Sequence, residues 1–454
     1  MKTSSRSKSI VLIVSSLSLL MVGLDATAVN VALPAIGRDL GADVAGLQWT
    51  VDAYTLVVAA LLLLSGSIAD RVGRRRTMLV GLGLFSAASL ACSVAPSVGL
   101  LVAFRAAQAV GGAMLNPVAM AIVANTFTEP RERAQAIGIR GAMFGVSMAL
   151  GPLLGGLLTG SVGWRAIFLI NVPIGLAAIA LTRSFVPESR AENPRRLDPI
   201  GQVLMTLLLG TVVFGLIEAP VVLVAAAVML IAFLAYERRR REPLIDPRFF
   251  RSVPFSSGIA ASVAAYAAFG GFLFLTTLYL QGAHGLSPLA AGAVLAPMAV
   301  MTVIASPLSG RILGRRGARI PLAIAGGGIL AGCLALTGIG AQTPVALLVL
   351  ATVVFGIGFG FVNAPVTEAA VSGMPRAQAG VASAIATTSR MLGQALGVAV
   401  AGAILGSPHS TGGLVVASRA AWWTLAGCGA AVLLLSVIAT TARAAESARR
   451  VRVA

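Results

Sequence analysis

A carboxylate inside an apolar segment is the feature of this sequence that points most directly to a chemical role. Asp25 lies in the run Leu24–Pro34, within a stretch of apolar residues long enough to cross a bilayer. An ionisable side chain at that depth is costly unless it is paired, hydrated or neutralised. Membrane proteins that keep such a group usually move something, and a carboxylate can carry a proton. We therefore predict that Asp25 binds and releases protons.

A basic side chain and an amide in the fourth apolar segment could accompany this acid. Arg105 and Gln108 are three residues apart, so they lie on one face of a helix. Arg105 could extend to the nearby membrane surface, as long basic side chains do. The alternative is a buried cation that lies next to Asp25 and changes its affinity for protons. We favour the second interpretation because Arg105 lies several residues inside its segment.

A second acid, Asp52, lies in the second apolar segment, three residues after Trp49 and two before Tyr54. The spacing puts Trp49 and Asp52 on one helix face. Asp52 could be an interfacial charge, and the two rings could belong to an aromatic belt at the membrane surface. It could equally be a second carboxylate for proton coupling or for a cationic substrate. The sequence leaves both interpretations open.

Two further arginines lie inside apolar segments without an evident partner. Arg140, toward the inner end of the fifth segment, could face the cytoplasm or pair with the loop after the second segment. Arg390 stands near the middle of the thirteenth segment, where an unpaired guanidinium would be expensive. Glu368, at the inner end of the twelfth segment, is its candidate partner.

The loop after the second segment combines glycines, one acid and several arginines. The residues of interest are Gly66, Asp70, Arg71, Gly73, Arg74 and Arg75. Asp70 can pair with arginines or cap a neighbouring helix, and the glycines permit close packing and a tight turn. We predict a conformational latch whose charge contacts form in one state and break in another. Ordinary anchoring by positive charges is the alternative.

Small residues recur along the fifth apolar segment, and a proline interrupts them. They include Gly145, Gly151, Pro152, Gly155 and Gly156. Small residues four apart let helices approach closely, and a proline bends its helix. Close helix packing alone would explain this pattern.

The composition is that of an all-α polytopic membrane protein. Of 454 residues, 57% are hydrophobic and 11% are charged, with a mean hydropathy of +0.92. An average soluble domain carries about 25% charged residues. A length of about 20 apolar residues per span gives fourteen candidates. They cover approximately 10–35, 47–69, 77–96, 98–126, 135–159, 164–183, 198–217, 219–236, 254–281, 289–313, 318–340, 344–368, 378–406 and 418–440.

The arginines predict the orientation of these spans. With the N-terminus in the cytoplasm, the outer loops hold only Arg38, Arg165 and Arg419, and the remaining loop arginines lie inside. This asymmetry follows the positive-inside rule, so we expect both termini in the cytoplasm. It also explains the net charge of +18 without nucleic-acid binding. The first span is expected to be a retained helix rather than a cleaved signal.

The run Gly310–Arg319 repeats the glycine spacing of Gly66–Arg76, with Gly314 in place of the acid. A repeated half of about six helices fits parallel repeats related by an axis along the membrane normal. We therefore predict three parts: a six-helix bundle over 1–183, linkers with two inserted spans over 184–253, and a second bundle with a tail over 254–454.

Several classes of protein and site are disfavoured by residues that are scarce. Cys92, Cys333 and Cys428 are widely spaced within apolar segments, which suggests neither a metal site nor a disulfide framework. The two histidines, His284 and His409, fall in predicted outer loops, so a histidine relay is not expected. The only lysines are Lys2 and Lys8, and a phosphate-binding Walker A loop needs a lysine after its glycines. We expect no enzyme activity and no cofactor other than a proton gradient.

With these motifs in order, the chain resembles the fourteen-span drug:proton antiporters of the major facilitator superfamily. The resemblance is carried by the runs Leu24–Pro34 and Gly66–Arg76, by Arg105, Gln108 and Gly111, by Gly151–Gly156, and by Trp164–Gly175. It implies the major-facilitator fold and a hinge or gate-sealing role for the glycines of the fifth span.

The resemblance also implies a function. We expect a monomeric antiporter in the cytoplasmic membrane that exports hydrophobic or amphipathic drugs or antibiotics, with protons and lipids as its other partners. A proton-coupled or facilitated importer of a small metabolite is the alternative. Candidate side chains for a substrate cavity, each of which could instead be core or lipid-facing, are Gln108, Asn116, Phe272, Gln281, Arg390 and Gln394.

Overall fold

Within the residues that it describes, the computed structural model consists of helices joined by turns and irregular segments, and it contains no strand. These residues are 5–191, 198–240, 247–340, 342–372, 379–406, 411–441, 444 and 446–447. In this part of the chain, 13 helices are long and apolar enough to cross a membrane, and the shorter apolar helix Arg319–Leu334 stands at the eleventh predicted span. The prediction of a multi-pass all-α membrane protein is confirmed. His409 lies outside the described residues.

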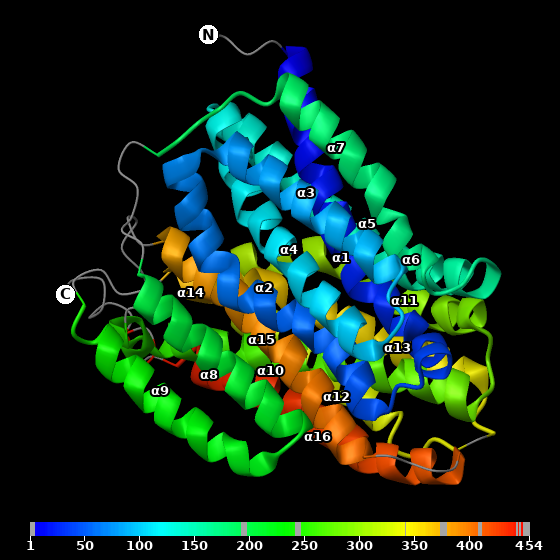
Figure 1. Cartoon of the computed structure of the whole chain (residues 1–454). Coiled ribbons are helices and arrows are strands. Elements are labelled where there is room, and N and C mark those ends of the chain that lie inside the picture. The colour runs from blue at the N-terminus through cyan, green and yellow to red at the C-terminus, as the bar shows by residue number, and fades with distance from the viewer. Residues whose placement is uncertain are drawn as a thin grey trace.

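The first bundle contains α1 to α7 (Figure 1). Within it, α1 packs against α5 and α7, α2 against α4, and α3 against α4 and α7. The helices are α1 (Ser5–Leu40), α2 (Val44–Val72), α3 (Arg74–Ser93), α4 (Val98–Thr126), α5 (Pro130–Ser161), α6 (Ala166–Leu169) and α7 (Asn171–Phe185).

The second bundle repeats this packing scheme. Its pairs α10 with α15, α11 with α13, and α12 with α16 correspond to α1 with α5, α2 with α4, and α3 with α7. Its elements are α10 (Val253–Leu278), the π-helical turn η3 (Tyr279–Ala283), α11 (Pro288–Arg316), α12 (Arg319–Leu334), α13 (Val345–Gly360), α14 (Asn363–Ser372), α15 (Ala379–Leu405) and α16 (Thr411–Ile438).

Two helices between the bundles lie side by side at one edge of the molecule (Figure 1). They are α8 (Pro199–Ile217) and α9 (Leu223–Glu237), joined by the 3₁₀ turn η1 (Pro220–Val222), and the turn η2 (Pro247–Arg251) follows α9. α8 contacts both α2 and α15, so it lies on the line where the two bundles meet.

Two predicted spans are broken rather than continuous. The sixth is divided between α6 and α7 at Ile170, and the twelfth between α13 and α14 at Phe361 and Val362. Proline clashes with the carbonyl four residues earlier, and Pro173 and Pro365 stand at this distance after Leu169 and Phe361.

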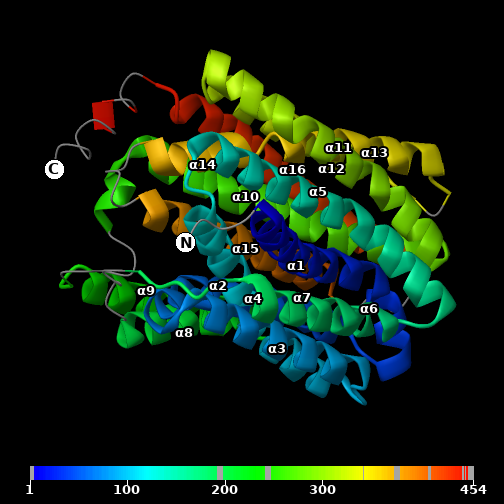
Figure 2. The same ribbon diagram turned by 90° about the horizontal axis from the view of Figure 1, so that it is seen from above.

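The two bundles meet along a seam formed by α5 with α11 and by α2 with α15. Figure 2 shows α5 next to α11 and the second bundle largely on one side of the first. We call the end at which α1 begins and α16 ends the inner end, and the opposite end the outer end. Near the outer end the Gln48 amide on α2 donates to the carbonyls of Val398 and Ala399 on α15.

Candidate functional site

The ionisable residues predicted to meet in the first bundle form one buried cluster. Arg105 Nη1 donates to Asp25 Oδ2, and the two residues are 1% and 2% exposed. Gln108 Nε2 donates to Asp25 Oδ1 at 2.8 Å, and Asn171 Nδ2 reaches the same oxygen at 3.2 Å. Arg105 therefore does not extend to the membrane surface. Three helices, α1, α4 and α7, supply the cluster.

Further contacts satisfy the polar atoms of Arg105 and Gln108. Arg105 Nε donates to the carbonyl of Thr50 at 3.0 Å, and its guanidinium carbon lies 4.4 Å from the centre of the Tyr54 ring. Gln108 Oε1 accepts from Arg105 Nη1 at 2.6 Å, and Gln108 Nε2 also donates to Ser89 Oγ at 2.8 Å. A buried ion pair persists only when its remaining donors and acceptors are satisfied. The Arg105–Asp25 pair meets this condition through the hydrogen bonds described above.

The hydrogen bonds of this cluster depend on the charge of Asp25. Ionised Asp25 accepts hydrogen bonds from Arg105, Gln108 and Asn171. A protonated carboxyl carries one O–H donor and loses its charge, so it can no longer balance the guanidinium. Protonation of Asp25 would therefore leave Arg105 as an uncompensated buried cation, which favours rearrangement of the surrounding helices.

Asp52 is buried in α2 and is not an interfacial charge. The residue is 0% exposed, Oδ1 accepts from Thr55 Oγ1 at 3.5 Å, and Oδ2 has no hydrogen-bond partner among the described residues. It stands one helical turn after Gln48, which faces α15, so Asp52 lies toward the seam. Trp49 instead bonds Glu218 Oε1 through its indole N–H at 2.9 Å.

The loop between α2 and α3 brings together part of the predicted latch. Asp70 Oδ1, at the end of α2, and Arg74 Nη2, at the start of α3, form an ion pair at 3.0 Å. Gly73 makes the turn with a φ of 125°, a conformation that favours glycine. Gly66 makes only an ordinary contact, 3.9 Å between the place of a Cβ and Pro117. The tight backbone position of this loop is therefore Gly73.

Glu188, after α7, holds the other side of this loop, and sequence reasoning missed it. Its carboxylate accepts the backbone N–H groups of Arg75 at 3.1 Å and Arg76 at 3.2 Å, at the start of α3. Arg75 Nη2 donates to the carbonyl of Arg183 at 2.5 Å, and Arg71 is exposed in the last turn of α2. An anion at a helix N-terminus is stabilising because several N–H groups there lack helical partners.

Glycines of α5 let this helix pack closely against α1 in its own bundle and against α11 in the other bundle. A Cβ on Gly155 would lie 2.8 Å from the carbonyl oxygen of Ala28, and one on Gly151 would clash with Thr27. These two glycines therefore fit α5 against α1, beside the helix turn that carries Asp25.

The other glycines of the same helix face the second bundle. A Cβ on Gly156 would lie 2.9 Å from Cα of Leu289, and one on Gly145 would lie 2.7 Å from the Val303 side chain. The carbonyl of Pro152 touches Gly292 of α11. α5 thus meets α11 from the middle of the seam to its outer end, which is where a gate would have to open.

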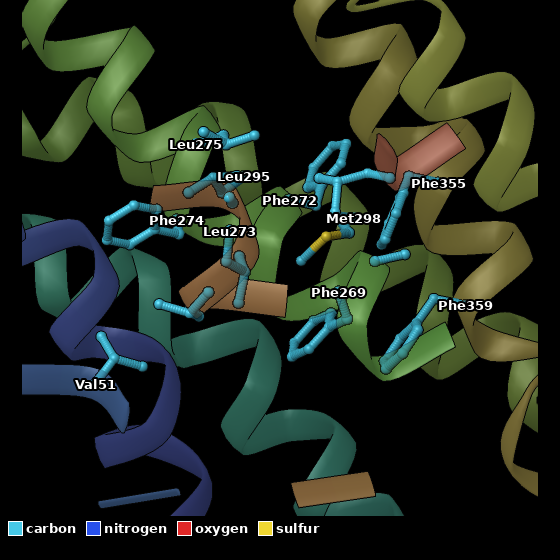
Figure 3. Close-up of a cluster of buried hydrophobic side chains, with 14 of the residues drawn as sticks. Val51, Phe269, Phe272, Leu273, Phe274, Leu275, Leu295, Met298, Phe355 and Phe359 are labelled. Atoms are coloured by element: carbon cyan, nitrogen blue, oxygen red, sulfur yellow. The ribbon is translucent and has the colours of Figure 1, made fainter. Parts of the chain in front are cut away.

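The residues predicted to line a substrate cavity do not lie around one common site. Gln108 belongs to the ion-pair cluster, and the others lie elsewhere. Phe272 is stacked on Phe355 with ring centres 4.0 Å apart, in a buried apolar cluster that contains residues of both bundles (Figure 3). The structure shows core packing at this residue, and its place in a substrate cavity stays a prediction. Gln281 Nε2 donates to the carbonyl of Val31 at 2.8 Å, across the seam near the outer end.

The remaining polar candidates lie on the helices that flank the seam or contact them. Gln394 is 4% exposed on α15, where its backbone carbonyl adjoins Gly270 of α10. Asn116 on α4 accepts a hydrogen bond from Arg140 on α5 at 3.2 Å. Arg140 therefore neither faces the cytoplasm nor pairs with the loop after α2. The reason is depth: it is the eleventh residue of α5, about 15 Å along the helix axis.

The candidate partner of Arg390 is also corrected. Arg390 Nη2 donates to Thr367 Oγ1 at 2.7 Å, whereas Glu368 is exposed. Adjacent residues of a helix point about 100° apart, so when Thr367 faces α15, Glu368 does not.

Two repeated helical bundles, a seam between them and a buried ion pair define a polytopic membrane transporter. Residues 15–398 match the family model described as Major Facilitator Superfamily. The chain belongs to the major facilitator superfamily.

Proteins with known names are similar to most of the chain. It is 37% identical over 416 residues to the multidrug resistance protein Stp of Mycobacterium tuberculosis, covering 88% of this chain and 76% of that protein. It is 37% identical over 410 residues to the tetracenomycin C resistance and export protein of Streptomyces glaucescens, covering 87% and 76%. The multidrug efflux pump LfrA of Mycolicibacterium smegmatis is 36% identical over 405 residues, with 87% and 80% covered.

Solved structures share the fold at lower identity. A bacterial homologue of the human lysosomal transporter Spinster, in an inward-facing and unoccupied conformation, matches with a TM-score of 0.70 and 18% identity over 99% of both chains. A bacterial homologue of the human peptide transporters PepT1 and PepT2 matches with a TM-score of 0.71 and 17% identity over 98% of this chain and 99% of that one.

Proposed function

We propose that this protein is a proton-coupled antiporter that exports hydrophobic or amphipathic drugs or antibiotics. Export is supported by the relatives named above, which share 36 to 37% of their aligned residues with the chain and are named as resistance or efflux proteins. Proton coupling is supported by one observation above all. Asp25, a titratable acid 2% exposed in α1, is bonded to Arg105, Gln108 and Asn171.

The proposed cycle couples protonation of Asp25 to opening of the seam. The structure is closed toward the outer end, where Gln48 and Gln281 bond backbone carbonyls of the opposite bundle. Protonation of Asp25 weakens its contact with Arg105 and lets α1, α4 and α7 shift relative to one another. α5 packs on α1 through Gly151 and Gly155, so a shift of α1 reaches the α5–α11 contact directly.

Asp52 is proposed as a second proton or cation site. It lies on α2 toward the seam and has one carboxylate oxygen without a described partner. When α2 and α15 separate at the outer end, this carboxyl would become accessible from that side. It would then exchange protons with the outside, before or after the drug leaves.

We further propose a monomer in the cytoplasmic membrane with both termini in the cytoplasm and with no cofactor besides the proton gradient. The arginine distribution supports this orientation, because the expected outer loops hold only Arg38, Arg165 and Arg419.

The test is transport in reconstituted vesicles. The purified protein is placed in proteoliposomes with a defined pH difference, and movement of ethidium and of protons is followed in both directions. We expect ethidium to move against its gradient while protons move the opposite way, and both fluxes to stop when nigericin collapses the pH difference. Movement of both in the same direction, or ethidium export unaffected by nigericin, would contradict the proposal.

A further inference from the structure

Arg140 is a buried base for which the proposed proton cycle has no role. It is the eleventh residue of α5, and its side chain is 4% exposed. At 1.5 Å per residue this position lies about 15 Å along the axis from the inner end of the helix. A guanidinium is always charged. The protein therefore holds a full positive charge deep inside its first bundle.

The contacts of Arg140 do not neutralise this charge. Nη2 donates to Asn116 Oδ1 at 3.2 Å and Nη1 approaches Met120 Sδ at 3.0 Å, both on α4. Within the described part of the chain, Nε is buried without a hydrogen-bond partner, and no carboxylate contacts the guanidinium. Arg105, one helix away, has Asp25 as its counterion. An uncompensated buried charge costs several kcal/mol, so Arg140 lacks an anion that would stabilise it.

The neighbours of Arg140 define what kind of anion would fit. Asn116 gives its carbonyl oxygen to Arg140, so its amide N–H groups remain as donors. Met120, one turn further along α4, is apolar and 38% exposed, so this face of the helix reaches the protein surface. The hydrogen-bond donors of Arg140 and Asn116 suit an acidic oxygen of a ligand. The neighbouring thioether of Met120 suits an apolar part of the same ligand.

The second bundle offers an internal comparison. Its fifth helix, α15, carries Arg390, which donates to Thr367 on α14 at 2.7 Å, so an arginine on the fifth helix again bonds a polar side chain on the fourth. Arg390 is partly exposed, whereas Arg140 is buried. Arg390 Nε is likewise buried without a described partner, so the two arginines differ in the exposure of the whole residue, and Arg140 is the more enclosed cation.

We propose that Arg140 and Asn116 form an anion-binding subsite that takes the carboxylate or phenolate of an exported amphipathic compound. The proposal rests on the proposed export function and places compounds with an acidic group among its substrates. The guanidinium supplies charge and paired donors, Asn116 supplies a further donor, and Met120 contacts the apolar part of the ligand.

The test uses two dyes that differ in one group. Rhodamine 110 has a free carboxylate, and rhodamine 123 is its methyl ester. Binding of each to the full-length protein in phosphatidylcholine nanodiscs is measured by fluorescence anisotropy. We expect the unaltered protein to bind rhodamine 110 at least about tenfold more tightly than Arg140→Gln does, while the affinity for rhodamine 123 changes less than about twofold. Arg140→Lys should retain part of the preference, because it keeps the charge without the planar fork.

The matched control is Arg131→Gln, an exposed arginine at the start of the same helix, which should bind both dyes like the unaltered protein. Benzoate should displace rhodamine 110 from the unaltered protein and benzamide should not, a comparison that needs no variant to fold. Retention of rhodamine 110 affinity in Arg140→Gln, or equal loss of both dyes, would overturn the proposal. So would displacement of rhodamine 110 by phosphatidylglycerol, which would assign the site to a lipid headgroup.

Failure of this inference can be distinguished from failure of the proposed function. If rhodamine 123 or ethidium is exported against a gradient while no carboxylate preference exists, the antiporter stands and the anion subsite does not. If neither dye is transported but rhodamine 110 binding depends on Arg140, the subsite stands without the antiport function.

Discussion

The amide of Gln48 on α2 donates to two consecutive carbonyls of α15, Val398 at 3.1 Å and Ala399 at 2.8 Å. One side chain of the first bundle is thereby hydrogen-bonded to the backbone of the second bundle near the outer end. Gln281 makes the reciprocal contact, from the second bundle to Val31 of α1. When the bundles separate, these side-chain hydrogen bonds to backbone carbonyls can be replaced by hydrogen bonds to water. They therefore stabilise the closed arrangement only modestly, and it can open.

A side chain at Gly156 should disturb the closed outer seam. Its Cβ would lie 2.9 Å from Cα of Leu289 on α11, so Gly156→Val forces α5 and α11 apart. Overpacking of this kind costs about 1–3 kcal/mol. We expect a longer distance between spin labels at Val162 and Gln342, measured by double electron–electron resonance, and slower export. Gly160→Val on the same helix, where a Cβ has no neighbour within 4 Å, is the control. Equal spin-label distances in the two variants would show that Gly156 is not needed for the close contact between α5 and α11.

Replacement of Asp25 by asparagine should abolish proton-driven export. Asparagine keeps the shape of the side chain, but it cannot gain or lose a proton at physiological pH. We expect dye accumulation in inverted vesicles under a pH difference to fall to the level of empty vesicles, with protein amount unchanged on immunoblots. Asp43→Asn is the matched control, because Asp43 caps α2 through the N–H of Gly46 and asparagine caps equally well. Full-rate transport against a gradient in Asp25→Asn would refute the assignment.

Breaking the ion pair from one side should be worse than removing both charges. Arg105→Gln leaves Asp25 buried without its cation, and such one-sided removal typically costs about 3–5 kcal/mol. Asp25→Asn combined with Arg105→Gln leaves two neutral amides. We expect the double variant to melt at a higher temperature in detergent than Arg105→Gln alone, although neither should transport. A double variant whose destabilisation equals the sum of the single ones would show that the two residues do not interact.

Glu188 should stabilise the start of α3 through its bonds to the N–H groups of Arg75 and Arg76. Loss of a side chain that caps a helix typically costs about 0.5–2 kcal/mol. We expect Glu188→Ala to lower the melting temperature and to increase hydrogen exchange of the first turn of α3. Glu188→Gln keeps an acceptor oxygen and should lose less. Unchanged exchange in Glu188→Ala would mean that the contact contributes nothing.

The ion-pair cluster shows how far a sequence can predict a membrane site. Asp25 and Arg105 could be identified because charges inside apolar segments are rare, and Gln108 because it stands one turn from Arg105. Asn171, which also bonds Asp25, and Ser89, which bonds Gln108, are uncharged polar residues of other spans. Such residues occur in many helices, and only the packing of α3 and α7 decides which of them reach the cluster.

The spans themselves follow from hydropathy, whereas their breaks and partners do not. The division at Ile170 depends on Pro173, and a proline bends some helices and interrupts others. Phe272 illustrates a different limit, because an aromatic ring in an apolar helix suits a core, a lipid face or a pocket equally well. Its stacking on Phe355 is a tertiary fact (Figure 3). Glu188 belongs to no recognisable motif, so nothing in the sequence singled it out.

The inserted helices should loosen at acidic pH through Asp198, the residue before α8. Burial acts to raise the pKa of this carboxyl, but hydrogen bonds from the Gly201 N–H, the Tyr236 hydroxyl and Arg240 outweigh it and hold the pKa below its ordinary value. A lowered folded-state pKa means that the stabilisation is present above the unfolded value, about 3.9, and is lost as the pH falls through the lower folded value.

We therefore expect hydrogen exchange at the inner ends of α8 and α9 to be constant from about pH 7 to pH 5, after correction for the intrinsic rate, and to rise below about pH 4. Asp198→Asn should remove this rise, since asparagine does not titrate but still caps α8. Asp43→Asn, at the other end of the bundle, should leave the rise intact. If the acid-dependent exchange persists in Asp198→Asn, another group controls it, and the contact between Asp198 and Arg240 is not what fastens α9 to α8.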